Sequence, residues 1–137
     1  MAQSSTARAG SPGWGETQAP AARILVVDDD RALSTMVSLV LKQSEFDVHV
    51  VNNGDDAIRR ATESNFDAVV LDLRMPGKDG RTVFRELRQL GVQAPVLILS
   101  AYDARQAQAE LGAEGFMNKP FEPEVLVATL RQMLART

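Results

Sequence analysis

The stretch that decides the fold is Ile24-Leu25-Val26-Val27-Asp28-Asp29-Asp30. Its first four residues form a continuous apolar run, which is typical of a short strand buried on both faces of a sheet. Three aspartates follow at once, so the strand is predicted to end in an acidic loop, where Asp30 caps the next helix. Behind them, apolar residues recur at helical spacing and predict an amphipathic helix of about residues 31–44.

The same alternation of strand and helix continues along the chain. Further strands are predicted at residues 48–51, 68–71, 96–99 and 115–117, and further helices around residues 57–61, 83–87, 104–111 and from 123 onward. Asp79 is predicted to cap the third helix. Five strands alternating with five helices predict an α/β domain, with a mostly parallel sheet and helices on both faces. In such sheets, sites form at the carboxyl ends of the strands.

Composition narrows the class of protein. The 137 residues suit one domain, and the hydrophobic fraction of 45% is enough for a core. The absence of cysteine excludes disulfides and thiolate metal sites. The net charge of −3 gives no basic face for duplex DNA, and no apolar run is long enough to span a membrane. Residues 1–22 are small and polar and are predicted to be a flexible tail, so the domain comprises residues 23–137.

Polar side chains follow four of the five predicted strands. They are Asp28 and Asp29 after the first strand, Asp72 after the third, Ser100 after the fourth and Lys119 after the fifth. Two unit charges about 4 Å apart repel by about 4 kcal/mol at an effective dielectric constant of about 20, so convergent acids require shifted pKa values or a cation. Oxygen ligands in an open site suit Mg²⁺. A divalent cation, a carboxylate, an amine and a hydroxyl together suit a phosphoryl group.

Four runs of the sequence resemble the signatures of the response-regulator receiver family. They are Ile24-Leu25-Val26-Val27-Asp28-Asp29-Asp30, Val70-Leu71-Asp72-Leu73-Arg74-Met75-Pro76-Gly77, Leu99-Ser100-Ala101 and Asn118-Lys119-Pro120-Phe121. An acidic pair alone is a weak signal, but four motifs in the right order, each at a strand end, are specific. The resemblance implies a doubly wound, flavodoxin-like fold with strand order 2-1-3-4-5 and a role in two-component signal transduction.

The resemblance also implies roles for the residues at the strand ends. Asp72 would be the nucleophile that forms an aspartyl phosphate, taking its phosphoryl group from a histidine kinase, a phosphotransfer protein or acetyl phosphate. The ligands of Mg²⁺, or of Mn²⁺ in its place, would be Asp28, Asp29, Asp72 and the backbone carbonyl of Arg74. Lys119 would pair with Asp72 at rest and with the phosphoryl oxygens afterwards. The chain would be a phosphoacceptor with self-catalysed phosphotransfer and autodephosphorylation, not an enzyme in the usual sense.

A switch follows from the same resemblance. Ser100 would hydrogen-bond the phosphoryl group and draw its loop inward, and Phe116 would move into the vacated space, although a core role for Phe116 is the other interpretation. Arg74 and Tyr102 occupy variable positions beside the pocket, and we hypothesise that they restrict the access of water. His49, the single histidine, is expected to be exposed on the second strand and not to be a phosphohistidine.

Other expectations concern partners and the fourth helix. We expect a cytoplasmic protein with an unidentified downstream target, for which the family resemblance allows a phosphorylation-dependent dimer. The net charge and the lack of a long apolar run predict no direct contact with DNA or membrane. The segment from Ser100 to Lys119 is about three residues, nearly one helical turn, shorter than in relatives. The fourth helix is therefore predicted to be short or mobile, which leaves the dimerisation mode of that face open. Both a stand-alone receiver and a piece of a longer regulator fit the sequence.

Three other functions are compatible with parts of the pattern. The spacing of Asp28 and Asp30 matches the Asp-x-Asp motif of haloacid-dehalogenase-type phosphatases, but residues 115–119 lack the paired acids which that family needs. A receiver-like module that is never phosphorylated would usually have lost some of the strand-end residues. A flavodoxin-like flavin binder would need hydroxyls and glycine in its first loop, where three aspartates would repel the cofactor's phosphate.

Overall fold

The computed structural model describes residues 20–136, so most of the predicted tail, residues 1–22, lies outside the described residues. The strands within this range are β1 (Arg23–Val27), β2 (Asp47–Val51), β3 (Ala68–Asp72), β4 (Val96–Ser100) and β5 (Gly115–Asn118). The helices are α1 (Arg31–Gln43), α2 (Gly54–Glu63), α3 (Gly80–Gln89), α4 (Ala104–Leu111) and α5 (Pro123–Ala135). This order confirms the predicted alternation, and α1 ends one residue earlier than the prediction, with Ser44 as its C-terminal cap.

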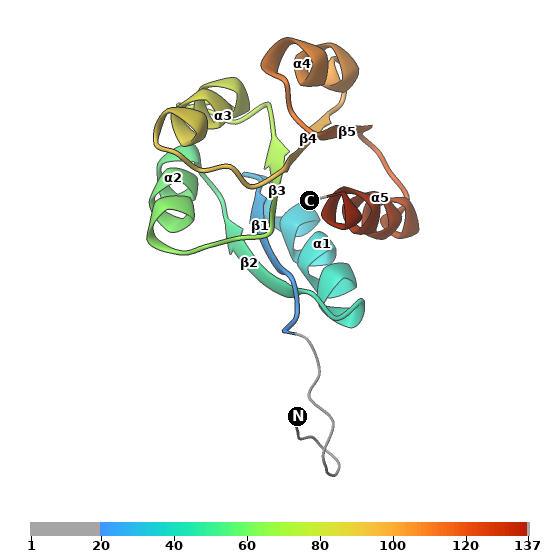
Figure 1. Ribbon diagram of the computed structural model, residues 1–137. Coiled ribbons are helices and arrows are strands. Elements are labelled where there is room, and N and C mark those ends of the chain that lie inside the picture. Colours follow the sequence, from blue (N-terminus) through green and yellow to red (C-terminus); the bar gives the residue numbers. More distant parts are fainter. Residues whose placement is uncertain (1–19, 137) are drawn as a thin grey trace.

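The strands form one sheet in the order β2-β1-β3-β4-β5, and every neighbouring pair is parallel. Helices α2 and α3 lie on one side of this sheet, and α1 and α5 lie on the other (Figure 1). The predicted parallel sheet with order 2-1-3-4-5 is therefore confirmed. The chain passes from β1 outward to β2 and then returns to β3 on the other side of β1. The loops after β1 and β3 consequently diverge, which is where sheets of this kind place their sites.

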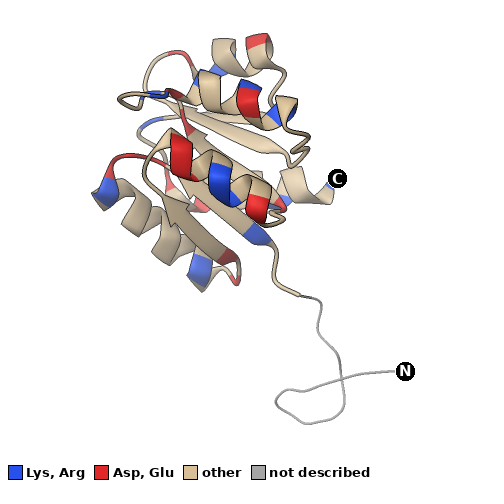
Figure 2. Ribbon diagram, turned by 90° about the vertical axis from the view of Figure 1, so that its left-hand side faces the viewer, with Lys and Arg blue, Asp and Glu red and all other residues tan. Residues whose placement is uncertain are grey.

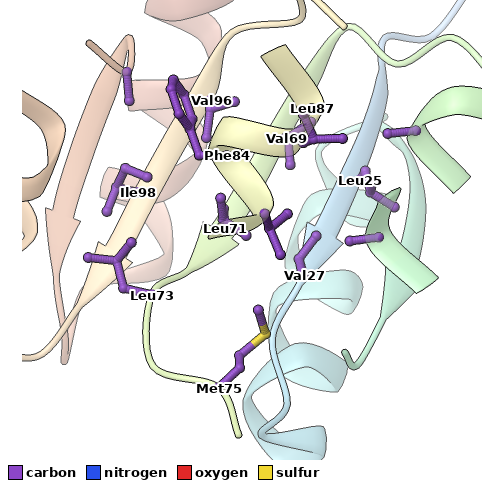
Figure 3. Packing of buried hydrophobic residues seen from close by; sticks show 14 of the residues in the cluster. Leu25, Val27, Val69, Leu71, Leu73, Met75, Phe84, Leu87, Val96 and Ile98 are labelled. Carbon is purple, nitrogen blue, oxygen red and sulfur yellow. The ribbon is translucent and has the colours of Figure 1, made fainter. Parts of the chain in front are cut away.

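Two apolar cores flank the sheet because successive side chains of a strand point to opposite faces. In β1, Leu25 and Val27 enter the core beneath α2 and α3, whereas Ile24 and Val26 enter the core beneath α1 and α5. Figure 3 shows Leu25 and Val27 beside side chains of β3 and α3 in the first of these cores. All five residues of β3 and all five of β4 are buried. This burial on both faces explains why residues 68–71 and 96–99 are continuous apolar runs in the sequence.

Side-chain caps fix where three helices begin. The carboxylate of Asp30 accepts the N–H of Leu33 at 3.1 Å, and that of Asp79 accepts the N–H of Thr82 at 2.9 Å. Both caps were predicted from the sequence, and each stabilises its helix by about 1 kcal/mol. Asn53 caps α2 in the same way through the N–H of Asp56 at 2.8 Å. No helix in residues 20–136 has both the length and the apolar character needed to cross a membrane.

Helix α4 is the shortest helix of the described chain, with 8 residues against 13 in α1 and in α5. It buries only the two small side chains of Ala104 and Ala107. It ends at Gly112, whose φ of 75° is a left-handed conformation that glycine adopts without strain. The prediction of a short fourth helix is confirmed, and its mobility stays a prediction.

The expectation that His49 is exposed was wrong. The side chain is half-buried at the sheet edge, where its ring meets Phe66 edge-on at a centroid distance of 5.4 Å. A guanidinium nitrogen of Arg60 lies 2.7 Å from Nδ1, and Asp47 lies 3.3 Å from Nε2. The alternating pattern of β2 could not reveal that Arg60 of α2 and Phe66, which lies between α2 and β3, cover this side chain.

Gly80 is required where α3 begins against β3. A Cβ at this position would overlap the carbonyl oxygen of Asp72 and would lie 2.7 Å from Cα of Leu73. We predict that Gly80→Ala lowers the free energy of unfolding by about 1–3 kcal/mol, because the backbone there must shift to relieve the overlap. Urea unfolding measures this effect. Arg85→Ala, on the exposed side of α3, is the control and should stay within about 0.5 kcal/mol of the parent; an equal loss in both variants would contradict the prediction.

Candidate functional site

The predicted site residues gather at the carboxyl edge of the sheet. Asp28 directly follows β1, Asp72 ends β3, Ser100 ends β4 and Lys119 directly follows β5. The register places Asp72 beside Leu99, the residue before Ser100, and places Ser100 beside Asn118, the residue before Lys119. Parallel strands in this register therefore bring together side chains that are far apart in the sequence.

Three carboxylates form the centre of the site. Asp28, Asp29 and Asp72 each offer an oxygen, and these oxygens all lie within 4.8 Å of one another. Asp28 is 1% exposed and Asp72 is 3% exposed, whereas Asp29 is open to solvent. The backbone N–H of Asp30 donates to Oδ1 of Asp28 at 2.9 Å, so the acidic loop orients its own first carboxylate. The predicted convergence of the acids is thus present in the structure.

Lys119 bridges the two buried carboxylates. Its Nζ lies 3.1 Å from Oδ2 of Asp28 and 3.2 Å from Oδ1 of Asp72. Burial by itself would lower the pKa of Lys119, but the hydrogen bond to Asp28 and the negative charges of Asp28 and Asp72 together raise the pKa above its ordinary value. The amine is therefore charged at neutral pH. The peptide bond between Lys119 and Pro120 is cis.

Burial and like charge raise the pKa of Asp72 to about 6. Desolvation is the larger cause and the charge of Asp28 is the second, while Lys119 and the N–H of Arg74 oppose them. That N–H donates to Oδ1 of Asp72 at 3.3 Å. Oδ1 thus receives the contacts from both Lys119 and Arg74, and among the described hydrogen bonds and ion pairs Oδ2 of Asp72 receives none.

Ser100 is fully buried, and its hydroxyl points to Asp103, an acid that lies outside the sequence motifs. Oγ of Ser100 donates to Oδ1 of Asp103 at 2.8 Å and accepts the N–H of Tyr102 at 3.4 Å. The hydrogen bond from Ser100 is the main reason why the pKa of Asp103 lies below its ordinary value. Asp103 precedes α4 and would have been interpreted as a helix cap, yet its side chain makes no capping hydrogen bond.

The remaining predicted residues surround this centre. The guanidinium of Arg74 lies 5.7 Å from the ring centroid of Tyr102 and 3.8 Å from Asp103. Tyr102 is 84% exposed, so this pair stands at the solvent side of the site. Phe116 is half-buried opposite Ile98 and packs against the core beneath α2 and α3. Phe116 thus packs as a core residue in this structure, and its movement on phosphorylation stays a prediction.

The charges on the α2 and α3 side of the molecule are mixed. Figure 2 shows acidic and basic residues interspersed along the helices that face the viewer. Ion pairs account for part of this pattern, as between Lys78 and Glu86 at 2.9 Å and between Arg59 and Asp56 at 2.7 Å. The described residues of this face therefore mix acidic and basic side chains and form no continuous basic stripe.

Comparison with known proteins identifies the class. The family model for the response regulator receiver domain matches residues 24–131. The chain therefore belongs to the response-regulator receiver family of two-component systems. Receiver domains are not enzymes in the usual sense, and the haloacid-dehalogenase-type phosphatase is not favoured.

The sequence relatives are bacterial regulators. The chain is 40% identical to the response regulator MprA of Mycobacterium leprae over 118 residues, which cover 84% of this chain and 52% of the relative. It is 38% identical to the transcriptional regulatory protein TrcR of Mycobacterium tuberculosis, with 84% and 46% covered. The chain thus spans about half the length of the curated relatives it matches.

Solved structures with the same fold include single receiver domains. The chemotaxis response regulator CheY4 of Vibrio cholerae matches with a TM-score of 0.76 and 30% identity, covering 82% of this chain and 98% of CheY4. The receiver domain of the sensor histidine kinase PA1611 of Pseudomonas aeruginosa matches with a TM-score of 0.78 and 26% identity, covering 84% and 98%. That structure has a magnesium ion coordinated in its active site cleft.

The raised pKa of Asp72 predicts a pH-dependent effect of its removal. A carboxyl whose pKa is higher in the folded state favours folding below its unfolded pKa, and this contribution is lost as the pH rises through about 6. We predict that Asp72→Asn stabilises the protein by about 1–3 kcal/mol at pH 7.5, and by less at pH 4.5, because asparagine removes the buried charge. Urea unfolding in EDTA at the two pH values measures this.

Asp55→Asn is the control for this measurement, because the side chain of Asp55 is 82% exposed. It should change the stability by less than about 0.5 kcal/mol at both pH values. A destabilising effect of Asp72→Asn at pH 7.5, or an effect that grows as the pH falls, would contradict the interpretation.

Proposed function

We propose that the chain accepts a phosphoryl group on Asp72 with Mg²⁺ at the site, and that this modification changes which proteins its surface binds. The observation that supports the proposal is the bridge from Lys119 to two buried carboxylates, Asp28 and Asp72, with Asp29 beside them. One ammonium group cannot balance three carboxylates. A divalent cation would compensate the remaining negative charge. A purely structural ion pair would be balanced and would leave no such excess.

The donor set fits Mg²⁺. Octahedral ligands at about 2.0–2.1 Å from an ion lie up to about 4.2 Å from one another, close to the spread of the three carboxylate oxygens, so small side-chain adjustments would suffice. We propose Asp28, Asp29, Asp72 and the backbone carbonyl of Arg74 as the ligands, with Asp28 binding directly or through water, and Mn²⁺ takes the same oxygen donors. When bound, the ion would neutralise charge on the phosphoryl oxygens.

The chain's own groups would carry the transfer. Because Lys119 and the N–H of Arg74 occupy Oδ1 of Asp72, Oδ2 is the oxygen we propose to attack phosphorus. The P–N bond of a phosphohistidine breaks as the O–P bond forms, and the electron pair leaves with the imidazole nitrogen. Lys119 lies within reach of both Asp72 and the incoming oxygens, so it would exchange one negative partner for another. Water would later reverse the modification without a second enzyme.

The partners follow from this chemistry. The phosphoryl donor would be a histidine kinase or a phosphotransfer protein, met in the cytoplasm, with acetyl phosphate as a small substitute. Ser100 and Phe116 would convey the change to the surface, where a downstream protein or a second copy of the chain would bind. The net charge of −3 supports a protein partner and not direct contact with DNA.

The test of the proposal is incubation with acetyl phosphate and Mg²⁺ followed by intact mass measurement. We predict a gain of one phosphoryl group that is absent in Asp72→Asn and in EDTA. Asp47→Asn, which removes a half-exposed acid at the opposite end of the sheet, is the matched control and should be labelled like the parent. Labelling that persists in Asp72→Asn would sink the proposal. Turnover of a phosphate monoester by Asp72→Asn would favour the phosphatase instead.

A second prediction concerns how long the phosphoryl group survives. Arg74 and Tyr102 join the β3–α3 and β4–α4 connections across the solvent side of the site. We predict that an Arg74→Ala, Tyr102→Ala double variant loses the phosphoryl group roughly two- to fivefold faster, the factor expected for a contact of about 0.5–1 kcal/mol. The decay of the labelled mass after removal of acetyl phosphate measures this. Tyr102→Phe keeps the ring and should decay at the parent rate; an unchanged rate in the double variant would count against the idea.

A further inference from the structure

We infer that Asp103 is a positioning residue that holds the hydroxyl of Ser100 in a resting orientation, so that phosphorylation of Asp72 must take this hydroxyl from Asp103 before the switch can operate. The inference rests on the proposed function and adds a regulatory element to it. Neither the family signatures in the sequence nor the site roles above assign any part to Asp103.

The first support is the hydrogen-bond capacity of Ser100. Its hydroxyl has one hydrogen, and in the structure that hydrogen goes to Oδ1 of Asp103 at 2.8 Å. Because the side chain is fully buried, bulk water does not reach the hydroxyl as an alternative hydrogen-bond acceptor. It cannot donate to Asp103 and to a phosphoryl oxygen at the same time. The two acceptors therefore compete directly.

The second support is that Asp103 is anchored on its far side. Arg81 of α3 lies 3.3 Å from Oδ2 of Asp103, and Arg74 lies 3.8 Å from the same oxygen. Arg81 also binds Glu110 of α4 at 2.8 Å. Two guanidinium groups keep the carboxylate charged and in place, and a charged acceptor binds a hydroxyl more strongly than a neutral one. The resting orientation of Ser100 is thus favoured by a network and not by one contact.

The third support is what Asp103 does not do. It stands at the N-terminal cap position of α4, where aspartate usually accepts a helix N–H, yet its side chain makes no such bond. Its carboxylate is engaged by Ser100 and Arg81 instead. When a phosphoryl group draws the hydroxyl away, both guanidinium groups remain with Asp103, so the charge of its half-buried carboxylate stays paired. The exchange is consequently reversible and behaves as a two-state element.

The experiment uses beryllofluoride with Mg²⁺ as a stable phosphoryl mimic and measures its dissociation constant by calorimetry. Asp103→Ala frees the hydroxyl of Ser100, so we expect beryllofluoride to bind about tenfold more tightly, while the affinity for Mg²⁺ alone is unchanged. Asp103→Asn keeps an acceptor without its charge and should give a smaller gain. In a Ser100→Ala background, Asp103→Ala should have no further effect, because the residue acts through that hydroxyl.

Glu110→Ala is the matched control, since it removes the other acid bound to Arg81 and leaves Asp103 and Ser100 in contact. It should bind beryllofluoride like the parent. Unaltered affinity in Asp103→Ala, or the same gain with and without Ser100, would overturn the inference. Should Asp103→Ala fail to fold by circular dichroism, the smaller gain in Asp103→Asn decides the matter. A parent protein that takes up neither beryllofluoride nor a phosphoryl group would instead refute the proposed function.

Discussion

Two carboxylates buried side by side repel each other, and the structure keeps them together through one amine. Asp28 follows β1 and Asp72 ends the neighbouring strand β3, and Lys119 reaches both from the residue after β5. Burial of Asp72 opposes its ionisation, so the strand ends would separate if nothing else fixed them. The apolar cores on both faces supply that constraint, because each buried Leu, Ile or Val side chain contributes about 1.5–3 kcal/mol. The cores therefore maintain an electrostatically unfavourable site, which the proposed cation and phosphoryl group would use.

The topology explains why this site lies between β1 and β3. The chain leaves β1 toward β2 and comes back to β3, so the loops on either side of the pair part from each other and expose the strand ends. Gly80 lets α3 approach the backbone of Asp72 directly, which fixes the position of that carboxylate from behind. Asp30 ends the acidic loop by starting α1. Two boundaries of the site are thus also the beginnings of helices, α1 and α3.

The apolar pattern of the sequence predicted the parallel sheet and the convergence of Asp28, Asp29, Asp72 and Lys119, because buried strands leave continuous apolar runs and polar residues interrupt them only at their ends. The strand order was implied by the family resemblance. It did not single out Asp103. An aspartate before a helix has a sufficient local explanation as a cap, and its actual partners, Ser100 and Arg81, come from β4 and α3. His49 was misplaced for the same reason, since Phe66 and Arg60 cover it from other elements. Local patterns contain no information on such long-range side-chain partners.

The sparse packing of helix α4 affects how a structural change at the site would reach a binding partner. It buries only Ala104 and Ala107, and its contact with α3 includes the ion pair between Arg81 and Glu110. Alanine methyl groups leave few interlocking contacts to break, and a half-exposed ion pair can re-form after a small displacement. We therefore expect α4 to shift with less loss of apolar burial than α1 or α5, although Leu111 at its end also packs against the core. Such a shift would let α4 present two alternative shapes to a binding partner.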